Sequence, residues 1–210
     1  MFKKEMTPQQ LRAYKMTFEE RQVWNETADR IREYCSGLVP QEYSQKIEYH
    51  LSTKDYLHYA GYCKKEGYYY VSEGDRGELY CLFKNADGEK MQIFLLENIL
   101  RDVGQKIELK LRDKEQMRWR FYEDLEKTVP GHIEWVENDT YVYGVKHDSR
   151  KLWFEFVLSG LIKTFGYEKV KDIVDEYTEH MNYWFSEKHW DFDREELTFV
   201  EIGGSSNENY

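Results

Sequence analysis

The sequence predicts an α+β protein in which an N-terminal helical region is followed by two tandem β-β-α-α-β units. The first observation behind this class is that residues 7–38 carry helix-start signals and one apolar stripe at helical spacing. The second is that residues 68–96 contain short aromatic and aliphatic runs separated by turn sequences, which is typical of strands. The third is that residues 94–137 resemble residues 156–201 in successive blocks. We therefore expect the two units to share a mostly antiparallel sheet, with helices on one face.

The length and the composition fit a single compact domain. The chain has 210 residues, and its aromatic fraction of 17% is too high for a disordered protein. We expect four segments within this domain. They are a helical region at 1–67, a first sheet-helix unit at 68–138, a second unit at 139–202 and a polar tail at 203–210.

The helical region opens with two helix-start signals. Thr7-Pro8 is typical of a cap followed by proline in the first helical turn. Thr17 and Glu20 have the spacing of a capping box, in which a hydroxyl and a carboxylate satisfy backbone amides at the start of a helix. Apolar residues at four- and three-residue spacing follow and predict an amphipathic helix that ends near Gly37. These residues are Trp24, Ala28, Ile31, Cys35 and Leu38.

The next segment, residues 40–67, leaves helix and strand open. Ile47, Leu51 and Leu57 suit one or two short helices, or a strand near Ile47. After Gly67 the apolar spacing changes to that of strands. We expect strands at 68–71, 79–83 and 90–96, separated by turns at 74–77 and 85–88.

A duplication is indicated by four matched blocks. Residues 94–104 align with residues 156–166, and the two blocks end in Gly104 and Gly166. A hairpin turn at Asp87-Gly88 matches one at Asp148-Ser149, and residues 133–137 match residues 197–201. In the remaining block, four residues of the first copy match four of the second in order: Met117, Trp119, Phe121 and Glu123 with Met181, Tyr183, Phe185 and Glu187. The alternative explanation is that unrelated strand-and-helix units share the same apolar spacing.

Each copy is expected to contain two hairpin strands, a short helix stopped by its glycine, a longer helix and a closing strand. In the second copy, apolar residues at helical spacing between 170 and 185 predict the longer helix. In the first copy, Ile107, Leu109 and Leu111 alternate as in a strand, but the repeat favours a helix. Asn138-Asp139 predicts a tight turn from the first copy's closing strand to the next strand.

The sequence shows no fingerprint of catalysis, of metal binding or of a cofactor, so we expect none of these. The 3 cysteines are widely spaced without a CxxC pair, which favours buried reduced thiols. A metal site could be drawn from Glu176, His180, His189 and Asp191, but this spacing is common by accident, and ordinary surface hydrogen bonding is the favoured explanation. An enzyme with an unfamiliar site near Glu176, His180 and His189 is therefore an alternative hypothesis.

Charge is distributed unevenly along the chain. The formal net charge of −10 argues against a protein that binds nucleic acid through counterion release. Residues 101–120 hold 7 basic and 4 acidic residues, a charge of +3, whereas residues 172–201 hold 2 basic and 10 acidic residues, a charge of −8. The aromatic residues that interleave with these acids are Trp184, Phe185, Trp190 and Phe192. The segment is either a solvated face with ordinary core aromatics, or an anionic surface with aromatic anchors for a basic protein.

Three features together suggest a family. The amphipathic helix ends in Gly37-Leu38-Val39-Pro40, tyrosine-rich hairpins occupy residues 68–83, and residues 189–193 are acidic and aromatic. In these features, and loosely over most of its length, the sequence resembles bacterial polymorphic-toxin immunity proteins, which are small cytoplasmic α+β proteins that bind and block one toxin. The resemblance implies binding rather than catalysis, and a nuclease toxin would be a natural basic partner. Toxin-binding residues vary between such families, so none is carried over by position.

The first hypothesis is thus an immunity-type binding protein that neutralises a cognate toxin through its acidic C-terminal surface. The partner-binding residues expected there are Glu187, Trp190, Asp191, Asp193, Glu195 and Glu196. A third hypothesis is a scaffold that oligomerises by pairing of sheet edges. The charged start of the chain is followed by no apolar stretch, so we expect a cytoplasmic protein without a signal peptide, a nucleic-acid partner or membrane contact.

Overall fold

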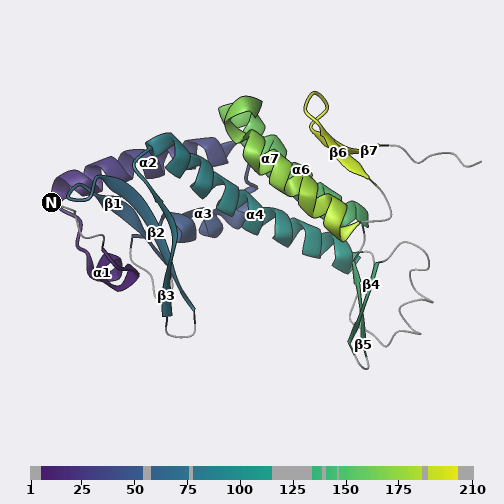
Figure 1. Ribbon diagram of the computed structural model, residues 1–210, viewed down its shortest axis with the longest axis horizontal. Helices are drawn as coiled ribbons and strands as arrows, with labels where there is room; N and C mark the ends of the chain where they lie inside the picture. The colour runs from purple at the N-terminus through teal and green to yellow at the C-terminus, as the bar shows by residue number, and fades with distance from the viewer. Residues whose placement is uncertain are drawn as a thin grey trace, which may run out of the picture. The chain divides into compact units, whose positions relative to one another are not determined.

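In the computed structural model the chain divides into two compact units, Met1–Leu100 and Arg101–Tyr210. Figure 1 labels the helices and strands of the chain. The structure describes residues 6–53, 58–75, 78–114, 134–138, 141–145, 147–185 and 189–202. Helices and antiparallel strand pairs occur in both units, which confirms the predicted mixed α/β class. None of the helices in these described ranges has the length and hydrophobicity that a membrane-spanning segment needs.

The first unit combines helices with one three-stranded sheet in the order β1-β2-β3. Its elements are α1 (Pro8–Ala13), α2 (Phe18–Ser36), the 3-10 helix η1 (Gln41–Tyr43), α3 (Ser44–Leu51), β1 (His58–Cys63), β2 (Tyr68–Asp75), β3 (Glu78–Asn85) and the beginning of α4 (Gly88–Lys114). Strand pairing is antiparallel throughout this sheet.

Both predicted helix starts in this unit are confirmed. Thr7 caps α1 and Thr17 caps α2, and each cap is a complete capping box. Helix α2 ends at Gly37, as its apolar stripe predicts. Trp24, Ala28, Ile31 and Cys35 of that stripe are buried, whereas Leu38 is half-buried beyond the helix end. Burial of this stripe attaches α2 to the core.

Helices cover both faces of the sheet. Leu11 of α1 packs against Tyr70 of β2 on one face. On the other face, Phe83 of β3 stacks on Phe94 of α4 with the ring centroids 4.6 Å apart. These faces are opposite because Phe83 pairs with Val71, the neighbour of Tyr70 in β2, and successive strand residues point to opposite sides.

Strand β1 is an element that the sequence did not predict. The segment around Ile47 is helix α3, one of the two structures left open, and β1 follows it. His58, Tyr59, Ala60 and Gly61 are all buried, so the strand has no polar side. A strand buried on both faces lacks the alternation by which strands are recognised.

The predicted strand at 90–96 and the turn before it are wrong, because helix α4 begins at Gly88. The Asp87 carboxylate accepts a hydrogen bond from the Glu89 amide at 2.8 Å, so this turn sequence caps a helix and does not close a hairpin. The most buried residues along the start of α4 follow helical spacing. They are Met91, Leu95, Leu96, Ile99, Leu100 and Val103.

Helix α4 also passes through Gly104 without stopping and continues to Lys114. The expected helix stop at Gly104 is therefore wrong. The expected helix at Ile107, Leu109 and Leu111 is confirmed, although it is the same helix and not a second one. The indole of Trp153 lies where a side chain at position 104 would be, so close packing explains this glycine.

The second unit contains the rest of α4, two β-hairpins and a pair of helices. Its elements are β4 (Glu134–Asn138), β5 (Tyr141–Val145), α6 (His147–Phe165), α7 (Tyr167–Trp184), β6 (Trp190–Asp193) and β7 (Thr198–Glu201). The hairpin predicted beyond Asn138 is confirmed by the pairing of β4 with β5. Gly166, with φ +84°, separates α6 from α7 and is the predicted helix stop. Helix α7 buries Val170, Val174 and Met181 of its predicted stripe.

Two expectations about the repeat are corrected in this unit. The hairpin turn expected at Asp148-Ser149 lies inside helix α6. Between residues 139 and 202 the described order is β5, α6, α7, β6, β7, and the described strands of the chain form three separate sheets, so the expected shared sheet is wrong. The block at 117–123 and the tail at 203–210 lie outside the described residues.

Candidate functional site

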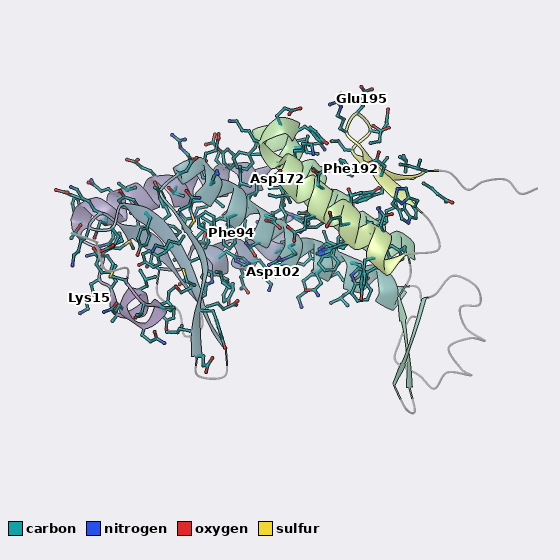
Figure 2. The ribbon with its side chains drawn as sticks, in the orientation of Figure 1. Lys15, Phe94, Asp102, Asp172, Phe192 and Glu195 are labelled. Carbon is teal, nitrogen blue, oxygen red and sulfur yellow. The ribbon has the colours of Figure 1, made fainter. Side chains whose placement is uncertain are left out.

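The acidic segment folds into the β6–β7 hairpin, whose two sides differ in exposure. Phe192 and Phe199 pair across the strands, are buried and meet edge to face with ring centroids 5.1 Å apart. Asp191 and Val200 form the neighbouring pair, point to the opposite side and are exposed. Figure 2 shows Phe192 on the hairpin beside α7 and Glu195 at its tip. The hairpin therefore has an apolar inner face and an acidic outer face.

Two polar side chains from the helices hold the backbone of the hairpin. The Asn182 amide of α7 donates to the Trp190 carbonyl at 2.9 Å and accepts from the Trp190 amide at 2.7 Å. The Glu155 carboxylate of α6 accepts from the Phe199 amide at 2.8 Å and from the Thr198 hydroxyl. These contacts attach β6 to α7 and β7 to α6, so the hairpin is positioned at both strands.

The side chain of Lys151 interacts with Glu155 and with Trp190 where the hairpin contacts the helices. Its Nζ lies 3.6 Å from the Glu155 carboxylate, one helical turn away on α6. The same Nζ lies 5.5 Å from the centre of the Trp190 ring. Trp190 is half-buried, so it forms part of the attachment of the hairpin and is not a fully exposed anchor.

The tip of the hairpin is a turn held by Asp193. Its carboxylate accepts from the Glu196 amide at 3.1 Å and the Glu195 amide at 2.8 Å, and these hydrogen bonds hold the pKa of Asp193 below its ordinary value. Leu197 closes the turn with φ +54°. The Arg194 guanidinium lies 5.7 Å from the centre of the Tyr167 ring. Glu195 and Glu196 are thus exposed carboxylates on an ordered turn.

The predicted partner-binding residues therefore have different surroundings. Asp191, Glu195 and Glu196 are exposed, Asp193 organises the turn, and Glu187 lies outside the described residues. Of the four aromatic residues that interleave with the acids, Phe185 and Phe192 are buried, which agrees with the alternative of ordinary core aromatics. At the end of α7, Trp184 and Tyr183 are exposed, although the sequence placed Trp184 on the apolar stripe of this helix. Tyr183 lies off the apolar stripe of α7, and that position was the sequence signal for its exposure.

The attachment of the hairpin predicts how amide exchange responds to mutation. In Asn182→Ala, the amides of β6 and β7 should exchange about tenfold faster, because two hydrogen bonds to the Trp190 backbone are lost. Glu155→Ala should have a similar effect through β7. Hydrogen–deuterium exchange with mass spectrometry measures both. Asp175→Asn is the matched control, since it removes an exposed ion pair with Lys171 on α7. Unchanged exchange in Asn182→Ala would show that the hairpin does not depend on this contact.

The residues of the alternative enzyme hypothesis are dispersed over exposed positions. Glu176 and His180 lie on the exposed face of α7, and His189 is exposed before β6. Among the described residues, no group of three or more His, Cys, Asp and Glu side chains is arranged to hold a metal ion. Among the described residues, this placement gives no site that contains Glu176, His180 and His189 together.

In the first unit, the sequence predicted the Thr17–Glu20 capping box but not the contacts of Glu20 with Tyr14 and Lys64. The Glu20 carboxylate accepts from the Tyr14 hydroxyl at 2.6 Å, the Thr17 amide at 2.7 Å and the Lys64 amide at 2.6 Å. A shallow cavity of about 560 Å³ lies beside it, lined by Tyr14, Thr17, Phe18, Glu19, Glu20, Lys64 and Lys65. Both oxygens of Glu20 already accept hydrogen bonds, so the carboxylate is poorly placed for proton transfer. Its hydrogen bonds join three segments of the chain, and in this sense we call Glu20 a clamp.

The hairpin is thus the feature in which exposed charge, fixed geometry and neighbouring aromatics coincide. It presents carboxylates to solvent from a backbone held at β6, β7 and the turn. Comparison of the chain with protein-family models, with curated proteins and with solved structures finds no match.

Proposed function

We propose that this chain is an immunity-type binding protein that neutralises a cognate bacterial toxin through the acidic face of the β6–β7 hairpin. The observation that carries the proposal is the fixed presentation of Glu195 and Glu196. Both are exposed, and the turn beneath them is held by Asp193. A preorganised surface loses little conformational entropy on binding, which favours affinity for a protein partner.

The charge of the hairpin together with that of α7 indicates the kind of toxin. Residues 172–201 carry a net charge of −8 out of −10 for the whole chain. Such a surface accelerates the encounter with a basic protein and disfavours acidic partners. A toxin that acts on nucleic acid needs a basic surface of its own, so a nuclease suits this face. Blocking that basic surface would also block its substrate.

The test is neutralisation of toxins encoded beside the gene. Co-expression of the chain with its cognate toxin should restore growth, and the two purified proteins should form a complex. If no neighbouring product is neutralised and none binds, the proposal is wrong.

A charge-reversal pair then locates the surface. In Glu195→Lys/Glu196→Lys, the association rate with the toxin should fall roughly tenfold at low salt, and its dependence on salt should weaken. Asp193 is left unchanged because its carboxylate holds the turn. The matched control is Glu26→Lys/Glu33→Lys, which makes the same charge change at exposed positions of α2. Stopped-flow kinetics measures both, and equal slowing would place the effect in net charge and not in the hairpin.

Pairing of sheet edges, the scaffold hypothesis, receives less support. Among the described strands, β3 is an edge strand, and its Tyr80 and Leu82 are exposed. Its register with β2 shifts between Val71 and Ser72. A bulge of this kind bends an edge strand and hinders its pairing with another sheet.

A further inference from the structure

The end of helix α7 carries an exposed pair of aromatic side chains. Tyr183 is 78% exposed and Trp184 is 42% exposed, and their rings meet edge to face with centroids 5.6 Å apart. The preceding residue, Asn182, is the one that binds the backbone of β6. The aromatic pair is therefore fixed beside the hairpin. Large aromatic side chains exposed on an ordered element are typical of interaction sites.

Further exposed apolar side chains lie at the same end of the second unit. Val200 is exposed on the outer side of the hairpin, and Ile202, the residue after β7, is also exposed. The Ile202 amide donates to the His189 carbonyl at 2.7 Å, next to Trp190, where Asn182 binds. The open end of the hairpin and the end of α7 thus lie together. We call the exposed residues Tyr183 and Trp184, whose rings are in contact, the aromatic patch.

Exposed carboxylates lie on the same two elements, α7 and the hairpin. Glu179 is one helical turn before Tyr183 on the exposed face of α7. Asp191 pairs directly with Val200 across the hairpin, so the two side chains lie on the same side of it. An aromatic ring with carboxylates around it attracts a cation to its face, and the carboxylates supply hydrogen-bond acceptors at the rim.

We propose that the aromatic patch binds an arginine side chain on the basic partner. A guanidinium group is planar and weakly hydrated, so it stacks on an aromatic ring and still forms two hydrogen bonds to one carboxylate. A lysine ammonium is strongly hydrated and lacks the planar shape, so it gains less from this arrangement. The patch then supplies the anchor of the complex, and the acidic tip at Glu195 and Glu196 guides the encounter. This inference rests on the proposed function, because it names the chemistry of the partner at the same surface.

The test compares two synthetic probes on the full chain. One is a short peptide that alternates arginine with glycine, and the other has lysine in place of every arginine. At about 0.15 M salt, where the Debye length is about 8 Å, calorimetry should show the arginine peptide binding about fivefold more tightly. Tyr183→Ala and Trp184→Ala should remove this preference, and both side chains are exposed enough for the fold to tolerate the change.

The matched control is Phe18→Ala, since Phe18 is 73% exposed in the first unit and far from this patch in the sequence. It should retain the full preference for arginine. Equal binding of the two peptides, or an unchanged preference in Tyr183→Ala, overturns the inference.

The outcomes also separate this inference from the proposed function. If a toxin is neutralised but Tyr183→Ala binds toxin and peptides like the unaltered chain, the patch is not the anchor and the function stands. If the arginine preference depends on Tyr183 but no toxin is neutralised, the patch stands as an arginine site and the immunity function fails.

Discussion

Replacing Glu20 with alanine is expected to lower the free energy of unfolding of the first unit by about 4 kcal/mol. The side chain is only 2% exposed, and its carboxylate accepts hydrogen bonds from Tyr14, Thr17 and Lys64. Removal leaves these part-buried donors without their acceptor, which costs more than the loss of fully exposed contacts. Because the donors come from three segments, the change also separates the start of α2 from the turn after β1.

Chemical denaturation followed by circular dichroism measures this loss. The control is Glu19→Ala, which removes the neighbouring carboxylate and its ion pair with Lys64. Both partners of that pair are largely exposed, so stability should hardly change. If Glu20→Ala and Glu19→Ala have the same small effect, Glu20 is not a clamp.

The pH dependence of stability provides a second readout of the same carboxylate. Burial raises the pKa of Glu20, but the hydrogen bonds from Tyr14, Thr17 and Lys64 outweigh it, so the pKa lies below the ordinary value of 4.5. A carboxyl group with a depressed pKa in the folded state stabilises the fold above its unfolded pKa. That contribution is lost as the pH falls below 4.5. The decline should be smaller in Glu20→Ala, which lacks the group.

Replacing Gly104 with leucine is the second change with a large expected effect, a loss of about 3 kcal/mol. A Cβ atom at this position would lie 2.5 Å from Trp153 Cδ1 and 3.2 Å from Phe156 Cδ1. Trp153 has little freedom to move away, because its indole N–H donates to the Arg101 carbonyl at 3.0 Å. The better helix propensity of leucine contributes about 1 kcal/mol in the opposite direction, which is less than the cost of the clash.

Thermal denaturation, with near-ultraviolet circular dichroism to follow the tryptophans, measures the effect. Gly37→Ala is the control, since no atom lies within 4 Å of a Cβ built at that helix end and its φ of −100° suits any residue. It should leave stability unchanged or raise it slightly. A Gly104→Leu chain as stable as the unaltered one would contradict the close approach of α4 and α6.

Local signals were sufficient for several elements. The caps at Thr7 and Thr17, the stripe of α2 and the stripe of α7 depend on neighbours within one or two helical turns, and all were predicted. The β2–β3 pair was predicted for the same reason, since alternation and turn residues lie close together in the chain. The wrong predictions of secondary structure arose where one local sequence pattern is compatible with two structures. Asp87-Gly88 serves as a hairpin turn or a helix cap, and only the burial of α4 on one side distinguished them.

The candidate site likewise combines features that the sequence predicted with features that it did not. The sequence alone determined that acidic and aromatic residues are concentrated near the C-terminal end, because composition can be counted without a fold. Only the tertiary structure decided what each residue does. Glu155 binds Thr198 across a separation of 43 residues, and this contact, with Asn182, sets which side of the hairpin is outside. Phe192 thereby becomes core while Tyr183 stays in solvent, because burial depends on what packs against a side chain and not on its type.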